Sequence, residues 1–219
     1  IDDQVGEIIK AVKAKYGDNA LILFSADHGE MLGDHGLWGK HNCAYDEVWH
    51  IPLLVKYPGQ KTGTADRRLV NSVDFLPRCL EAAGAVIPAC DGRPLSDPDW
   101  ERDYTFAEGE GYLAVTDGRY KYVHVQKGRE HGRELLDLRE DPNEFENRIA
   151  LPEYQEALAA LREKMIEHVI PAILAGFVLV YLEKFFKKIT PQAISMIVVP
   201  FLSLVLAVIA AHAVLGPVG

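Results

Sequence analysis

The chain has 219 residues and a formal net charge of −9 at pH 7, and its length allows one or two domains. Residues 1–168 are strongly acidic, with 20 of the 23 Lys and Arg and 31 of the 32 Asp and Glu residues. This part has no basic stripe that could follow a phosphate backbone, which argues against nucleic-acid binding.

The remaining bulk features indicate an incomplete polypeptide with reduced thiols. None of the three cysteines belongs to a C-x-x-C pair, and we expect no disulfide framework among Cys43, Cys79 and Cys90. The chain begins with Ile1 and shows no signal peptide, so we expect it to derive from something longer.

The amino-terminal residues predict a helix. Apolar side chains recur at helical spacing from Val5 to Val12. Asp2 or Asp3 is placed to cap the start of the helix, and Gly17 to end it.

Two apolar segments predict strands. Residues 20–24 (ALILF) form a buried strand that leads directly into a polar loop, and residues 51–57 (IPLLVKY) form a second strand that ends at Pro58-Gly59. A helix, a strand and a polar loop make one unit of an α/β sheet, in which sites form beyond the carboxyl ends of strands.

The segment from Val73 to Gly84 predicts a short helix with Gly84 as its C-cap. On helical spacing, the side chains expected to face inward are Leu76, Leu80 and Ala83.

From Tyr104 the pattern changes to short strands and turns. Residues 112–116 and 119–124 flank Asp117-Gly118 and predict a hairpin. Residues 134–138 predict a further strand, which the turn Asp141-Pro142-Asn143 follows. Pro152 then starts a helix with one apolar face, made of Tyr154, Leu158, Leu161 and Met165.

At Val169 the chain becomes almost uncharged without a linker. Residues 169–182 are an apolar run of 14, too short for an ordinary span and therefore interfacial, re-entrant or a truncated span. Residues 193–218 contain no Asp, Glu, Lys or Arg and are long enough to cross a membrane, although a buried core helix is the alternative. If both insert, three lysines place the intervening loop on the cytoplasmic side: Lys184, Lys187 and Lys188.

The most specific segment is the loop Ser25–Lys40, SADHGEMLGDHGLWGK. Asp27 and His28 directly follow the predicted strand, and such a pair can ligate a divalent cation and contact an oxyanion. Lys40 supplies a compact positive charge suited to a tetrahedral anion. Together these groups suit hydrolysis of an ester with electrostatic stabilisation of the leaving oxygen. A second pair, Asp34-His35, is interpreted as loop support.

A family resemblance rests on residues 25–40 and on five shorter segments: YDE at 45–47, IPLLV at 51–55, VDFLP at 73–77, TDGRYKY at 116–122 and LDLREDP at 136–142. In these segments the chain resembles type I sulfatases and phosphonate monoester hydrolases of the alkaline-phosphatase-like superfamily. The resemblance covers residues 1–168. It implies that Asp27 and His28 are metal ligands, that His28 also lies close to the ester oxygen, and that Lys40 binds the sulfate. It further implies Ca²⁺ or Mn²⁺ as the metal and a sulfate or phosphonate ester as the substrate.

The same resemblance shows what the chain lacks. Family members carry a cysteine or serine nucleophile, oxidised to formylglycine, in a C-x-P-x-R or related motif near the amino terminus, together with an early acidic pair that completes the metal site. None of the three cysteines fits that motif, and Asp2-Asp3 precedes a helix instead of following a strand. We therefore expect this chain alone to bind metal weakly and to hydrolyse nothing efficiently.

The tail carries a second resemblance. Segments such as VIPAILAG at 169–176, VYLEKF at 180–185 and LGPVG at 215–219 resemble part of the EIIC membrane domain of sucrose- or β-glucoside-type phosphotransferase permeases. That domain carries sugar across the membrane. Glu183 and His212 are polar groups in this tail, and Glu183, beside two lysines, is expected at a solvated loop end.

These patterns predict three regions: residues 1–103, the carboxyl part of a sulfatase α/β domain; residues 104–168, a small antiparallel subdomain; and residues 169–219, one or two membrane helices. The leading hypothesis is a truncated sulfatase joined to a truncated permease. The alternatives are a membrane-tethered hydrolase and a sugar permease fragment with an accidental leader. The tail would place the chain at a bacterial inner membrane, whereas residues 1–168 alone would be soluble.

Overall fold

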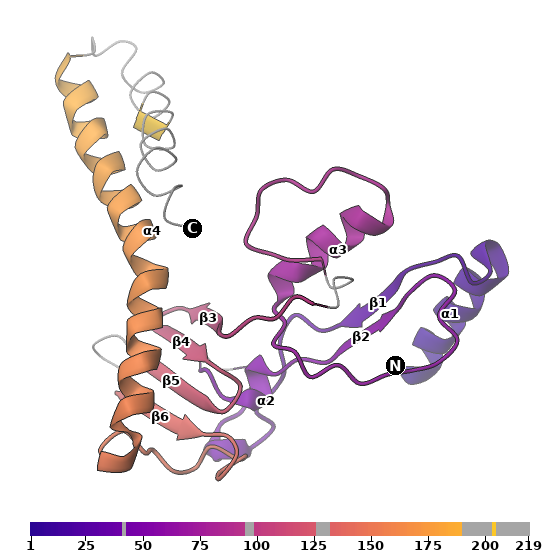
Figure 1. The fold of residues 1–219 in the computed structure, drawn as a ribbon, viewed down its shortest axis with the longest axis horizontal. Helices are drawn as coiled ribbons and strands as arrows, with labels where there is room; N and C mark the ends of the chain where they lie inside the picture. Colours follow the sequence, from indigo (N-terminus) through magenta and orange to yellow (C-terminus); the bar gives the residue numbers. More distant parts are fainter. Residues whose placement is uncertain (41–42, 95–98, 126–131, 190–202, 205–219) are drawn as a thin grey trace. The chain divides into compact units, whose positions relative to one another are not determined.

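The computed structural model describes residues 1–40, 43–94, 99–125, 132–189 and 203–204. Its contacts divide the chain into two compact units, Ile1–Leu161 and Arg162–Gly219. Figure 1 shows the elements in chain order, and each unit is described by itself below.

The first unit begins with helix α1 (Asp2–Tyr16), which confirms the predicted helix. Gly17 follows it with a φ of 60°, a left-handed conformation that glycine adopts without strain. The prediction for its start is wrong: Ile1 is the N-cap residue and makes no side-chain hydrogen bond. Asp2 and Asp3 lie inside the first turn, where their charges favour the helix dipole.

The two predicted strands form a ribbon of two. β1 (Ile22–Ser25) pairs antiparallel with β2 (Leu53–Lys56), with Ile22 opposite Lys56. The prediction that the first strand is buried is wrong, because none of its residues is buried and Phe24 is 39% exposed. Among the described residues this sheet has no third strand.

Between the two strands lie a one-turn 3-10 helix, η1 (Asp34–Gly36), and the short helix α2 (Asp46–Trp49). After the ribbon come η2 (Ser72–Asp74) and α3 (Phe75–Ala82), which confirm the predicted helix, with Gly84 at a φ of 66°.

The predicted inward face of that helix is wrong for two of its three residues, since only Leu80 is partly buried. Leu76 is 57% exposed and Ala83 is also exposed, whereas Asp74, Pro77 and Arg78 are buried. The physical reason is an ion pair between Asp74 and Arg102. The Asp74 carboxylate accepts hydrogen bonds from Arg102 at 2.7 and 2.8 Å, which turns the side of the helix that carries Asp74 inward.

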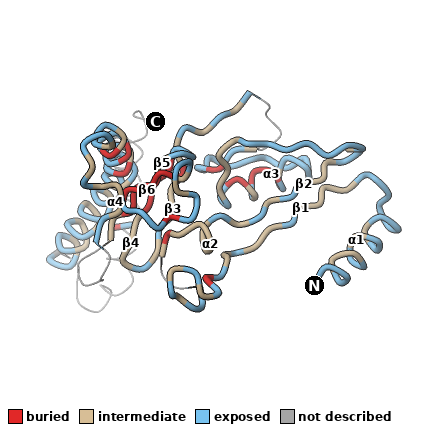
Figure 2. The backbone as a smooth tube through the Cα atoms, turned by 90° about the horizontal axis from the view of Figure 1, so that it is seen from below, coloured by how far each residue is buried: buried red, intermediate tan, exposed pale blue. Residues whose placement is uncertain are grey.

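The second sheet is a four-stranded antiparallel meander in the order β3 (Thr105–Gly109), β4 (Tyr112–Thr116), β5 (Tyr120–Val125) and β6 (Arg133–Asp137). The predicted hairpin is confirmed, with Thr116 opposite Lys121 and Asp117-Gly118 in the turn. Most of the core lies here: Ala114, Val115, Tyr122, Val123, Leu135 and Leu136 are buried. Figure 2 shows this concentration of buried backbone on β4–β6.

A short 3-10 turn, η3 (Pro152–Tyr154), leads into helix α4 (Gln155–Ile189). Its predicted apolar face is confirmed, because Leu158, Leu161 and Met165 are 1–7% exposed. The helix continues through Val169 and includes Pro171, so its backbone shows no break where the composition changes. The predicted span 193–218 lies outside the described residues, except for Ser203 and Leu204.

Candidate functional site

The loop Ser25–Lys40 connects β1 to the segment that leads into α2, and two backbone hydrogen bonds tie its start to that helix. Gly29 N–H donates to the Val48 carbonyl at 2.9 Å, and Glu30 N–H donates to the Glu47 carbonyl at 3.0 Å. A side chain at position 29 would not fit, since an added Cβ would lie 1.8 Å from the Glu47 oxygen. The backbone immediately after Asp27 and His28 is therefore held on α2.

Asp27 and His28 lie together, as the sequence predicts. His28 Nε2 is 3.5 Å from Asp27 Oδ2, and His28 Nδ1 is 2.8 Å from the Gly29 carbonyl oxygen. The Asp27 side chain is 88% exposed, whereas that of His28 is 35% exposed. Backbone N–H groups of Asp27 and His28 lower the pKa of the Asp27 carboxyl, and the nearby charges of His28 and Lys40 add to that effect. The carboxylate is thus ionised and open to a ligand.

Lys40 lies at the far end of the same loop and is exposed. Its charge lowers the pKa of Asp27 as the smallest of the contributing effects, and the described contacts include no ion pair between Lys40 and Asp27. The structure thus brings the Asp27–His28 pair together and leaves Lys40 more loosely associated with it.

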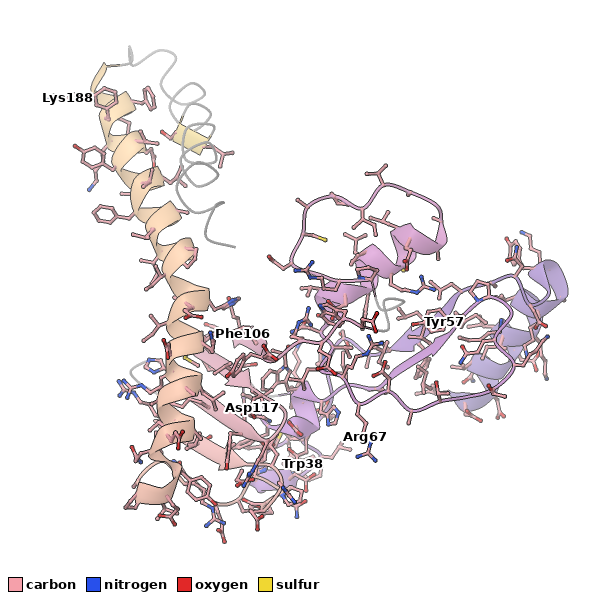
Figure 3. The ribbon with its side chains drawn as sticks, in the orientation of Figure 1. Trp38, Tyr57, Arg67, Phe106, Asp117 and Lys188 are labelled. Atoms are coloured by element: carbon pink, nitrogen blue, oxygen red, sulfur yellow. The ribbon has the colours of Figure 1, made fainter. Side chains whose placement is uncertain are left out.

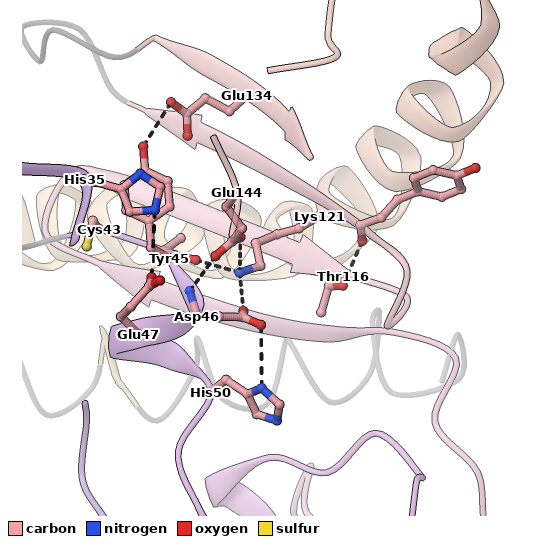
Figure 4. Close-up of polar contacts among 12 residues, drawn as sticks. His35, Cys43, Tyr45, Asp46, Glu47, His50, Thr116, Lys121, Glu134 and Glu144 are labelled. Atoms are coloured by element: carbon pink, nitrogen blue, oxygen red, sulfur yellow. Dashed lines mark hydrogen bonds and ion pairs between the residues drawn. The ribbon is translucent and has the colours of Figure 1, made fainter. Parts of the chain in front are cut away.

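His35 is held inside the loop by ring stacking, which the sequence did not specify. Its ring stacks on Tyr45 with centroids 3.9 Å apart (Figure 4). It also packs at a tilt on Phe145, with centroids 4.7 Å apart. Its backbone is left-handed, with a φ of 51°. Its Nε2 lies 3.9 Å from Glu47 Oε2, too far for a hydrogen bond. The structure is consistent with loop support as the role of His35.

The donor set fits part of a metal site. A carboxylate and an imidazole suit Ca²⁺ or Mn²⁺ in combination with further oxygen ligands. Within the residues that the structure describes, however, no group of three His, Cys, Asp or Glu side chains is placed to hold an ion. Asp27 and His28 therefore supply two ligands, and a complete coordination shell needs more.

A separate open hollow of about 540 Å³ lies on the first unit. Its lining includes Arg67, Arg68 and Arg102. Figure 3 labels Arg67 and a further lining residue, Asp117. Arg68 binds Asp66 and Arg102 binds Asp74, so most of this positive charge is neutralised locally. None of the three candidate site residues lines it.

Comparison with known proteins connects this geometry to one family. Residues 1–85 match the family model described as Sulfatase. The Delta 4,5-hexuronate-2-O-sulfatase of Bacteroides thetaiotaomicron is 28% identical over 77% of the chain, and an arylsulfatase of Clostridium perfringens is 30% identical over 76%. The chain is sulfatase-like over most of its length.

A solved structure supports the same conclusion for the fold. The phosphonate monoester hydrolase of Silicibacter pomeroyi superposes with a TM-score of 0.66 at 30% identity, over 77% of this chain and 38% of that one. The chain spans 39% of the hexuronate sulfatase and 37% of the arylsulfatase. The sulfatase-like fold is therefore represented here by well under half of its usual length.

Proposed function

We propose that the sulfatase-like part of the chain forms one wall of a metal-dependent sulfuric ester hydrolase site. The observation that best supports this proposal is the solvent-accessible Asp27–His28 pair, which follows β1. Hydrogen bonds from Gly29 and Glu30 to α2 fix the backbone directly after the pair. In this proposal Asp27 and His28 bind the cation, and His28 and Lys40 contact the sulfate or phosphonate ester group.

The chemistry of these residues suits that role. Ca²⁺ or Mn²⁺, when bound, would polarise the ester oxygens. Backbone N–H groups lower the pKa of the Asp27 carboxyl, which favours the ionised form that ligates a cation. Lys40 would balance the anionic charge of the substrate, and the imidazole of His28 would stabilise charge on the leaving oxygen.

The proposal includes inactivity of this chain by itself. Two metal ligands without a nucleophile do not make a sulfatase site. The remaining ligands and the nucleophile would come from polypeptide that corresponds to the unmatched length of the relatives.

A chimera tests this proposal directly. The matched 37% of the Clostridium arylsulfatase is replaced by the full 219-residue chain, and turnover of an aryl sulfate is measured with Ca²⁺ or Mn²⁺. We expect turnover by the chimera and none by the chain alone. Asp27→Ala and Lys40→Ala should each reduce turnover at least about a hundredfold, because each removes charge that acts in the transition state.

The matched control is Lys61→Ala, which removes an exposed lysine that pairs with Asp18, away from the loop. It should leave turnover unchanged. Turnover by the chain alone that Asp27→Ala abolishes would contradict the proposed inactivity. A folded but inactive chimera would contradict the proposal that Asp27, His28 and Lys40 bind the cation and the ester group.

A second candidate role concerns the tail, which we propose attaches the chain to a membrane. One described helix, Pro152–Lys188, is long and apolar enough to cross a bilayer, by length and composition only. Its large apolar side chains are exposed: Ile170, Ile173, Leu174, Phe177, Val180, Tyr181 and Phe185 are 46–72% accessible. Exposure of this kind favours lipid or protein contact over a soluble surface.

Flotation with phosphatidylcholine and phosphatidylglycerol vesicles tests the attachment. The full chain should float with the vesicles, and a variant with Phe177→Asp and Tyr181→Asp should stay in the soluble fraction. Flotation of both proteins alike would argue against attachment through this helix. The resemblance of the tail to a sugar permease stays a prediction.

A further inference from the structure

Lys121, on β5, is fully buried and takes no part in the proposed chemistry. Its ammonium group donates to the Ala44 carbonyl at 2.9 Å, and forms ion pairs with Asp46 and with Glu144 Oε1, the latter at 2.6 Å (Figure 4). A buried lysine is tolerated only when it is paired in this way. Two of these three partners lie at the start of α2 rather than on the sheet: Asp46 is its first residue, and Ala44 precedes it by two residues.

Glu144 completes the connection to the helix. Its Oε2 accepts a hydrogen bond from the Asp46 backbone N–H at 2.6 Å, which satisfies a free donor in the first turn of α2. Burial raises the pKa of Glu144, while the Lys121 charge opposes that rise. Lys121 thus favours the ionised form of the carboxylate that holds the helix.

Apolar packing reinforces the same attachment. Ala44 forms a buried cluster with Ala114 and Val123 of the sheet, and Trp49 packs against that cluster. Lys121 Nζ also lies 4.9 Å from the centre of the Trp49 ring, within the range of a cation–π contact. Helix α2 is therefore anchored to the four-stranded sheet at both of its ends.

Helix α2 is also hydrogen-bonded to the loop that carries the candidate site. The carbonyl groups of Glu47 and Val48 accept the hydrogen bonds from Glu30 and Gly29, directly after the Asp27–His28 pair. A four-residue helix has too few internal hydrogen bonds to fix its own position. Its position, and with it that of the loop backbone, depends on the contacts to the sheet.

We propose that Lys121 is a positioning residue, which fixes the Asp27–His28 pair through Asp46, Glu144 and helix α2. The chemical importance of this role rests on the proposed function, but the mechanical connection does not. Loss of the ammonium group leaves the buried Glu144 carboxylate and the partly exposed Asp46 carboxylate without their shared cation, and we expect α2 to detach and release the backbone at Gly29 and Glu30.

Amide hydrogen exchange of the full chain tests the connection. In Lys121→Met, the Gly29 and Glu30 amides should exchange about tenfold faster or more, because their acceptors on α2 have moved. Amides of β4 and β5 should change less than about twofold, which separates positioning from general loss of stability.

The matched control is Arg119→Met. Arg119 precedes the same strand and pairs with another buried carboxylate, Asp137, at 3.2 Å. The described hydrogen bonds of the Asp137 side chain come from Arg119 and from the backbone of Arg139 and Glu140, none of which belongs to α2. Arg119→Met should leave Gly29 and Glu30 exchange unchanged. Unchanged exchange at both amides in Lys121→Met would overturn the proposal, and so would an equal rise at these amides and throughout the sheet.

If Lys121→Met does not fold, Glu144→Gln serves the same purpose, because it keeps the shape of the side chain and removes the charge. The same selective rise is expected at Gly29 and Glu30, and no rise would overturn the proposal. Turnover by the arylsulfatase chimera is measured separately. An inactive chimera contradicts the proposed function, whereas only the exchange pattern decides the role of Lys121.

Discussion

The two sheets of the first unit differ sharply in burial. The four-stranded sheet contains most of the buried side chains, and Leu135 on β6 is fully inaccessible. The β1–β2 ribbon contains no buried residue, and Leu54 on β2 is 66% exposed. A sheet of four strands covered by helix is stable in isolation, whereas a two-stranded ribbon is marginal in water.

The candidate site depends on both sheets. Its loop begins at the end of β1 on the ribbon, but the backbone beyond His28 is bonded to α2, which is anchored on the four-stranded sheet. The order of the site should therefore follow the stability of the larger sheet, while the ribbon side remains open to a further polypeptide.

The largest effect should follow from Leu135→Ala in the four-stranded sheet. Deleting a fully buried side chain leaves a cavity and should lower the free energy of unfolding by about 2–5 kcal/mol. Urea denaturation of the full chain, followed by tryptophan fluorescence, measures it. A loss of less than about 1 kcal/mol would show that this sheet is not the main stabilising core.

Gly29→Ala addresses the connection between the two sheets. The new methyl group would lie 1.8 Å from the Glu47 carbonyl oxygen, so the loop must leave α2 and lose its two backbone hydrogen bonds. We expect a loss of about 2 kcal/mol in the same denaturation measurement.

Gly63→Ala is the matched control for that substitution, because an added Cβ at position 63 meets nothing within 4 Å. It should change stability by less than about 0.5 kcal/mol. Equal effects of the two substitutions would argue against a tight contact between the loop and α2.

The contrast between the sheets also explains which elements could be predicted from the sequence. The hairpin at Asp117-Gly118 depends on local turn chemistry and alternation, and both of its strands form where the sequence predicts them. The burial of residues 20–24 was predicted from an apolar run, but burial depends on what packs against a strand. The inward face of α3 was missed because a buried ion pair, Asp74–Arg102, overrides the apolar pattern.

The candidate site was predictable only in part for the same reason. Asp27 and His28 are adjacent in sequence, so their proximity needed no long-range information. Lys121 lies 75 residues from Asp46, and nothing local pairs them. The available signal was a lysine within the apolar strand RYKYVH, since a charged side chain in such a strand needs a buried partner.

A change of pH should affect the four-stranded sheet through Asp137. Burial raises the pKa of this carboxyl, but hydrogen bonds from Arg119 and from the backbone of Glu140 and Arg139 outweigh it and hold the pKa below 3.8. The stabilisation is therefore fully present above pH 3.8 and is lost as the pH falls through the lowered pKa.

Urea denaturation between pH 5 and pH 2.5 checks this dependence, which should be weaker in Asp137→Asn than in the unmodified chain. The effect should be smaller than that of the two substitutions above, because Arg119 is 46% exposed and water screens the pair. If the free energy of unfolding fell equally with pH in both proteins, Asp137 would not be a cause of the acid sensitivity.

The smallest effect should follow from Leu54→Ala on the ribbon. Because this side chain is mostly exposed, the free energy of unfolding of the 219-residue chain should change by less than about 0.5 kcal/mol. In the arylsulfatase chimera the same substitution should be more destabilising, if the added polypeptide covers the ribbon. Equal, small losses in both proteins would show that the ribbon stays exposed, whereas a loss comparable to that of Leu135→Ala in the chain alone would show that the ribbon already has a core of its own.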